Sequence, residues 1–171
     1  MRINDNCGVT GVLGIKFRHK ETGEIVDEFK QYNVITKEGF AELSKRLSGN
    51  TDTSYIDHIV LGTDVGSGTQ IEPEPAKDYF TASFQTELYT IPASDITVTY
   101  VSPTVFSFGC ILDGAAMLSE LGTTESEARF SSATLRFNNG KTCSFKRFTV
   151  KSITSIINIE VTWTINLSES K

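Results

Sequence analysis

The strongest constraint on the fold is a strict alternation of apolar and polar side chains near the C-terminus. Over residues 157–167, six apolar residues occupy every second position and five polar residues lie between them. Side chains of a β-strand point alternately to opposite faces, so this spacing puts all six apolar side chains on one face. The sequence therefore predicts a long antiparallel strand with one face in a core, and Trp163 lies on that face.

The same alternation, bounded by turn residues, recurs along most of the chain. Asn139-Gly140 supplies the positive φ angles that a tight hairpin turn needs, and Glu21-Thr22-Gly23 marks a second turn. Nine strands are expected, over residues 13–17, 25–29, 55–61, 80–88, 96–100, 106–112, 130–137, 142–150 and 157–167.

Only one segment carries the signals of a helix. Thr36 is a suitable N-cap and Gly49-Asn50 a suitable stop. An apolar stripe between them is expected to be buried: Phe40, Leu43 and Leu47. Nine strands and one short helix predict a mainly β protein, an antiparallel β-sandwich of the jelly-roll type, with residues 1–171 forming a single domain. The lack of alternating helices argues against a parallel α/β fold.

Two segments have no periodicity. Residues 62–78 are rich in glycine and proline and are longer than most connections in compact domains. This loop is therefore predicted to be a contact loop, in the form of an arm that reaches another subunit, with an extended part around its prolines. Residues 119–128 carry three glutamates and are predicted to be an exposed loop.

Charge and cysteine content limit the partners and the compartment. Lys and Arg number 16 against 21 Asp and Glu, and this balance argues against binding nucleic acid by counterion release. Three cysteines without CxxC spacing (Cys7, Cys110 and Cys143) encode neither a disulfide framework nor a zinc cluster, which fits the cytosol. No apolar run approaches ~18 residues, so neither a signal peptide nor a membrane anchor is expected.

Candidate catalytic motifs are weak. Gly140-Lys141-Thr142 ends like a phosphate-binding loop, but a hairpin turn occupies the place of the loop that should enter a helix. Asp57 and His58 are adjacent on a strand, so their side chains are expected on opposite faces, unable to share a proton. Two isolated histidines form no metal-ligand pair. The prediction is that the chain is not an enzyme and needs no cofactor or metal.

A pair of carboxylates suited to glycoside hydrolysis is left open by the sequence. Asp113 follows a strand, and Glu72 and Glu74 lie in the long loop. We interpret all three as solvated charges.

Three short patterns resemble those of small virion proteins of tailed bacteriophages. They are Asn33-Val34-Ile35-Thr36 with Gly39 at the start of the helix, Ile56 to Gly62 before the glycine-rich loop, and Ile159-Glu-Val-Thr-Trp-Thr-Ile165 near the end. The resemblance implies a non-enzymatic, β-rich assembly module made in the host cytoplasm and located in the virion. It implies a tail, collar or fibre-attachment component, or a capsid decoration, whose partners are other copies of itself and neighbouring virion proteins.

Serine and threonine then gain a predicted role. The chain has 17 Ser and 21 Thr, and many of them alternate with the apolar residues of a strand. Such residues make outward sheet faces that can form hydrogen bonds and small apolar contacts in a homo-oligomer. The candidate interface residues are Thr69, Ile71, Pro73, Pro75, Thr97, Thr99, Thr162 and Thr164. The alternative is a carbohydrate-binding β-sandwich module, which would display exposed aromatic side chains.

Overall fold

The computed structural model describes residues 7–50, 54–64, 85–122 and 126–169. These residues form nine strands, two α-helices and one short 3-10 turn. In chain order the elements are β1 (Cys7–His19), β2 (Ile25–Ile35), α1 (Lys37–Leu47), β3 (Ile56–Asp64), β4 (Gln85–Ile91), η1 (Ala93–Asp95), β5 (Thr97–Ser102), β6 (Val105–Asp113), α2 (Gly114–Glu120), β7 (Glu127–Phe137), β8 (Thr142–Thr154) and β9 (Ile157–Glu169).

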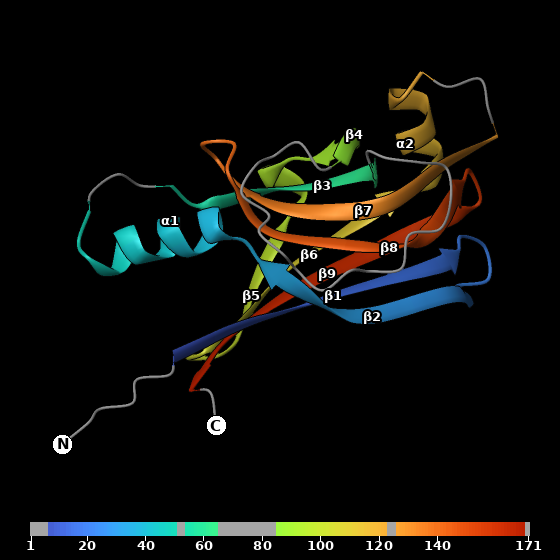
Figure 1. The fold of residues 1–171 in the computed structure, drawn as a ribbon. Helices are drawn as coiled ribbons and strands as arrows, with labels where there is room; N and C mark the ends of the chain where they lie inside the picture. Colours follow the sequence, from blue (N-terminus) through green and yellow to red (C-terminus); the bar gives the residue numbers. More distant parts are fainter. Residues whose placement is uncertain (1–6, 51–53, 65–84, 123–125, 170–171) are drawn as a thin grey trace.

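The strands make two antiparallel layers, as expected for a β-sandwich. Sheet A has the strand order β2-β1-β9-β6-β5, and sheet B has the order β4-β3-β7-β8. In Figure 1, β3, β7 and β8 form the upper layer, and β1 and β2 lie in the lower layer. The end of β2 leaves sheet A and pairs Val34 with Phe145 and Ile35 with Ser144 of β8. The order joins β1 to β2, β3 to β4, β5 to β6 and β7 to β8 as neighbours, so the expected jelly-roll connectivity is not confirmed.

The core lies between the inward faces of the two sheets. In sheet A, Trp163 pairs with Leu13 on one side and Phe108 on the other, and its side chain is fully buried, as predicted. In sheet B, the ring of Phe130 meets that of Phe148 edge-on, with centroids 5.6 Å apart. This ring also lies 6.1 Å from Phe17 of sheet A, which links the two layers through aromatic contact.

Helix α1 begins as predicted but buries a different face. The backbone N–H of Gly39 donates to Thr36 Oγ1 at 2.9 Å, which is the expected N-cap bond. The prediction of a buried apolar stripe is wrong at Phe40, which is 46% exposed, while Leu43 is half-buried and the side chain of Leu47 lies outside the described part. Among the helix side chains that the structure describes, the buried positions are Gly39 and Glu42. A Cβ at Gly39 would lie 2.3 Å from the carbonyl oxygen of Cys143, so α1 packs directly on the β8 backbone instead of on the core.

Helix α2 occupies part of the segment that was expected to be a loop. Asp113 caps it, since its carboxylate accepts the Ala116 N–H at 2.9 Å, and Met117 and Leu118 are buried. The loop predicted over residues 119–128 is therefore wrong at both ends, because α2 continues to Glu120 and β7 begins at Glu127. The helix is short, so it gave no periodic signal. The expectation of a single helix is corrected to two in the described residues.

The turns and strand ends agree with the sequence in part. Gly140 has φ 81° and Gly23 has φ 70°, so both predicted glycine turns are confirmed. Strand β3 continues past Gly62 to Asp64, so the first residues of the predicted long loop belong to a strand. Strand β4 ends at Ile91, later than expected, and the predicted residues 80–84 lie outside the described part of the chain.

Candidate functional site

The structure brings four of the predicted interface residues onto one surface. They are Thr97, Thr99, Thr162 and Thr164, all on the outer face of sheet A. Thr97 on β5 lies opposite Gly109 on β6, which in turn lies opposite Thr162 on β9. The next row on this face runs from Thr99 through Ser107 to Thr164. Three of the four threonines are exposed and Thr164 is half-buried.

Two glycines keep the middle of this face open. Gly14 on β1 pairs with Thr162 from the side opposite Gly109, so a row without bulky side chains runs from β5 to β1 and ends at Lys30 on β2. A Cβ at either glycine would meet no atom closer than 3.8 Å, so neither glycine is required by crowding. Shallow depressions of about 460 and 480 Å³ lie on the two sides of Thr162. Sequence reasoning missed the glycines, because only the strand register shows that they lie in one row.

Charged residues along one side of the glycine row alternate in sign. Lys16 pairs with Glu28 of β2 and with Glu160 of β9 in the strand register. Arg18 Nε donates to Glu160 Oε1 at 2.5 Å, with both side chains about one-third exposed. Such exposed pairs contribute little to stability. The surface therefore has mixed charge and favours neither polyanions nor polycations.

An aromatic cleft of about 410 Å³ opens at the β5 side of the sandwich. Its lining comes from α1, the segment before β3, and strands β3, β5, β6 and β7: Leu43, Ser54, Tyr55, Ile56, Val98, Tyr100, Phe106, Phe108 and Phe137. Tyr100 is 81% exposed, and its ring centroid lies 6.4 Å from that of Phe106. Tyr55 is 53% exposed on the facing side. The cleft thus offers two accessible tyrosines over an apolar floor.

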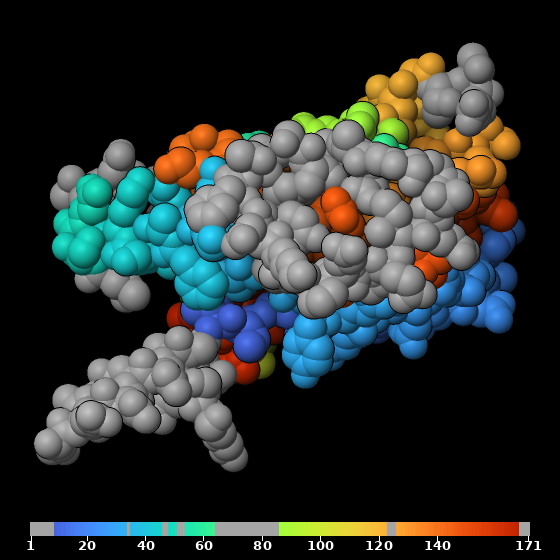
Figure 2. Space-filling view, viewed as in Figure 1, coloured from blue at the N-terminus to red at the C-terminus, as the bar shows by residue number. Residues whose placement is uncertain are grey.

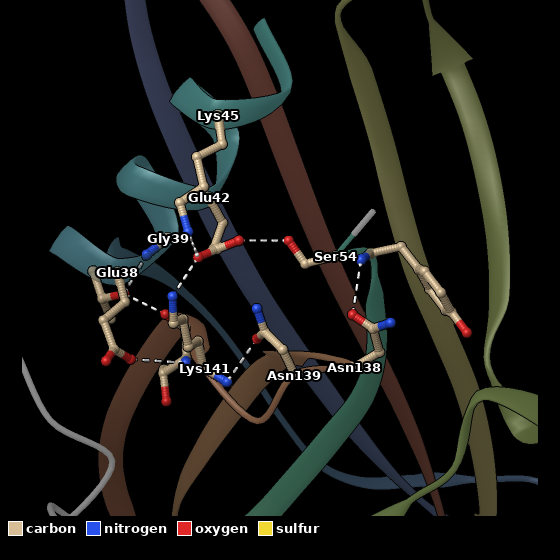
Figure 3. Close-up of polar contacts among 11 residues, drawn as sticks. Glu38, Gly39, Glu42, Lys45, Ser54, Asn138, Asn139 and Lys141 are labelled. Atoms are coloured by element: carbon tan, nitrogen blue, oxygen red, sulfur yellow. Dashed lines mark hydrogen bonds and ion pairs between the residues drawn. The ribbon is translucent and has the colours of Figure 1, made fainter. Parts of the chain in front are cut away.

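A buried carboxylate fixes the α1 side of this cleft (Figure 3). Glu42 has a side chain only 3% exposed, and its Oε1 accepts from Lys141 Nζ at 2.6 Å and from Lys45 Nζ at 2.9 Å. Its Oε2 accepts from Ser54 Oγ at 2.5 Å. These hydrogen bonds, led by the one from Lys141, lower the pKa of Glu42 to about 2. Glu42 therefore ties α1 to the β7–β8 turn, and sequence reasoning did not single it out.

The same turn holds the cleft residue Tyr55. Its N–H donates to Asn138 Oδ1 at 3.2 Å, and the Asn138 N–H donates to the Tyr55 carbonyl at 2.9 Å. Lys141, the lysine of the Gly-Lys-Thr sequence, pairs with Glu42. In the space-filling view, α1 forms one end of the described molecule (Figure 2). The turn and the helix therefore form one fixed wall of the cleft.

The expectation for Asp57 and His58 is wrong. Their side chains are hydrogen-bonded through Asp57 Oδ1 and His58 Nδ1. The register shifts between Ile56 and His58, which marks an irregularity in β3 at Asp57. Because a bulge interrupts the alternation of side chains, neighbours in sequence can meet there.

The other candidate residues have structural positions or lie outside the described residues. Asp113 accepts from Lys20 Nζ at 2.7 Å and caps α2, and these bonds, led by the one from Lys20, lower its pKa. Cys110 and Cys143 are buried free thiols whose pKa burial raises to about 12. The remaining predicted residues lie outside the described ranges: Thr69, Ile71, Pro73 and Pro75 of the predicted arm, and Glu72 and Glu74.

The described residues contain neither a metal-binding cluster nor a membrane-spanning helix. No group of three His, Cys, Asp or Glu side chains in the described ranges could hold a metal ion. Neither helix in this part of the chain is long and apolar enough to cross a membrane.

Comparison with known proteins adds no relative. No family model, no curated protein and no solved structure matches this chain. Function is therefore inferred from the sequence, the fold and the surfaces of this chain alone.

Proposed function

We propose that this chain is a non-enzymatic structural protein of a tailed-phage virion that binds copies of itself and neighbouring virion proteins. The observation that carries the proposal is the outer face of sheet A. Thr97, Thr99, Thr162 and Thr164 line it, and Gly14 and Gly109 expose its backbone. Small polar side chains on a pleated surface let a partner approach closely, and they offer hydrogen bonds without the desolvation of charges.

The position within the particle follows from the sequence patterns described above. They favour a tail, collar or fibre-attachment site over a capsid decoration. In each of these positions the protein would work by binding through a fixed surface. The part of sheet A around Thr162, where Gly14 and Gly109 leave the backbone open, is suited to such a contact, because residues on paired strands keep a fixed spacing.

The proposal is tested by mass spectrometry of gradient-purified particles made by the genome that encodes the chain. We expect the protein in the particles at a fixed ratio to the other virion proteins. We also expect the double variant Thr162→Lys, Thr164→Lys to fold normally and to be lost from them, because buried lysines would lack partners. Thr149→Lys, an exposed threonine on β8, is the matched control. Particles without the wild-type protein, or with normal amounts of the double variant, would contradict the proposal.

The aromatic cleft favours a second candidate function, that of a carbohydrate-binding module. Tyr55 and Tyr100 present exposed rings with polar hydroxyl tips to one apolar cleft, and such rings serve as amphipathic binding platforms. Saturable binding in a glycan array that Tyr100→Ala abolishes, together with absence of the protein from particles, would favour this function. Absence of glycan binding would remove it.

A further inference from the structure

Among the described residues, strand β5 is an uncovered edge of sheet A. It is the last strand in the order, its pairing within this part of the chain is with β6 alone, and all six of its residues are exposed. An edge strand leaves alternate backbone N–H and C=O groups without a partner strand. Proteins usually block such edges with charges, proline or a covering segment. The β5 sequence Thr-Val-Thr-Tyr-Val-Ser has neither a charge nor a proline, and it is rich in residues that favour strands.

The opposite edge of the sandwich differs. Strand β4 carries Glu87, which is ion-paired with Arg136 of β7, and its last residue, Ile91, is fully buried. A charge at an edge discourages pairing with another strand. The open edge at β5 is therefore a property of that strand and not of the sandwich in general.

The side chains on the two faces of β5 determine which side-chain pattern a partner strand needs. Val98 lies opposite Phe108, and Tyr100 opposite Phe106, so both point to the cleft side. They are nonetheless 44% and 81% exposed, because sheet B does not cover them. Thr97 and Thr99 point to the outer face. A fitting strand has apolar side chains on one face and small polar ones on the other.

We infer that β5 pairs antiparallel with β5 of a second copy of this chain, across a two-fold axis at Thr99. This register puts Thr99 opposite Thr99 and Val98 opposite Tyr100 on both sides of the axis. Threonine pairs and pairs of aromatic with β-branched residues are favourable across strands. The pairing with β6 is regular from Thr97 to Tyr100 and shifts before Ser102, so the inferred pairing uses the regular part.

A second copy fits this edge better than an unrelated strand, because its own β5 has the required alternation. A two-fold axis perpendicular to the sheet places the outer faces of both copies on the same side of the joined sheet. The threonine rows of the two copies therefore join, and the two aromatic clefts lie side by side. Such an interface is closed and stops at a dimer. The inference does not depend on the proposed function, since a carbohydrate-binding module could dimerise in the same way.

A cysteine at the two-fold axis gives the first test. Directly opposite residues of antiparallel strands have Cα atoms about 4.5–5.5 Å apart, within the range that a disulfide spans. The background is Cys7→Ser, and the remaining native thiols, Cys110 and Cys143, are buried. On mild oxidation we expect Thr99→Cys to form a dimer at twice 18.8 kDa on a non-reducing gel. The matched control is Thr90→Cys, exposed on the other edge strand, which we expect to stay a monomer.

Light scattering after size exclusion gives the second test, without a covalent link. We expect the wild type to be a dimer, Thr99→Lys a monomer that still unfolds in one cooperative transition, and Thr162→Lys a dimer, because Thr162 lies away from the edge. A monomeric wild type, a dimer that Thr99→Lys leaves intact, or equal cross-linking of Thr99→Cys and Thr90→Cys would overturn the inference. Presence or absence of the protein in particles reports on the proposed function alone.

Discussion

The two walls of the aromatic cleft are held in opposite ways. On the α1 side, Glu42 joins the helix to the β7–β8 turn through Lys141 and to the segment before β3 through Ser54, and the helix backbone lies directly on β8. On the other side, β5 pairs with β6 alone among the described strands, and all of its residues are exposed. One wall is thus fixed by buried polar bonds inside the subunit. The other wall leaves the backbone N–H and C=O groups of its edge strand available to a partner strand. Mutations should therefore affect stability at the first wall and association at the second.

Removal of the Glu42 carboxylate should have the largest effect on stability. Glu42→Ala removes the acceptor that Lys141, Lys45 and Ser54 share. Both lysines are about 40% exposed and can be hydrated, so we expect a loss of about 1.5–3 kcal/mol, the range for a hydrogen bond to a charged group. Tyr100→Ala on the opposite wall should cost less than about 0.5 kcal/mol, because Tyr100 is 81% exposed. Urea unfolding of both variants checks the difference. Similar losses in the two variants would mean that the walls are held alike.

The pH dependence of stability should show the same difference. The pKa of Glu42 is lowered from 4.5 to about 2 in the folded chain, so its contribution is fully present above pH 4.5. The contribution, about 3 kcal/mol by linkage, is lost as the pH falls from 4.5 through about 2. The free energy of unfolding should therefore decline more steeply over this range in the wild type than in Glu42→Gln. Parallel curves for the two proteins would exclude this role of Glu42.

A matched pair of glycine substitutions sharpens the comparison further. Gly39→Ala would place its Cβ 2.3 Å from the Cys143 carbonyl oxygen, and such overpacking costs about 1–3 kcal/mol. Gly109→Ala on β6 would meet nothing closer than 3.8 Å, so the change should lie within about 0.5 kcal/mol of the wild type. Thermal unfolding measures both. A large loss at Gly109 would show that the open face of sheet A tolerates no added side chain.

The sequence predicted the elements of the fold better than their contacts. Alternation and turn residues are local signals, so the nine strands, the turn at Gly140 and the burial of Trp163 could be read from the chain. The gathering of Thr97 and Thr162 on one face followed partly from alternation, but their common row with Gly109 depends on register. Register is set between strands far apart in sequence, and no local pattern encodes it.

The misses have a common physical origin. The bulge at Asp57 lets its side chain meet that of His58, and the close approach of Gly39 to β8 selects the buried face of α1. Glu42 gave no signal, because a single glutamate in a helix is ordinarily solvated. In each case a tertiary contact overrode a sound local expectation.

The crossing of β2 from one sheet to the other has a consequence for how the protein responds to load. Because Val34 and Ile35 pair with β8, the nine strands form one continuous hydrogen-bonded ladder that is folded back on itself. A pull on sheet A is passed to sheet B through backbone bonds as well as through the core. The two layers cannot slide apart until those bonds break, so the sandwich should yield as a single mechanical unit.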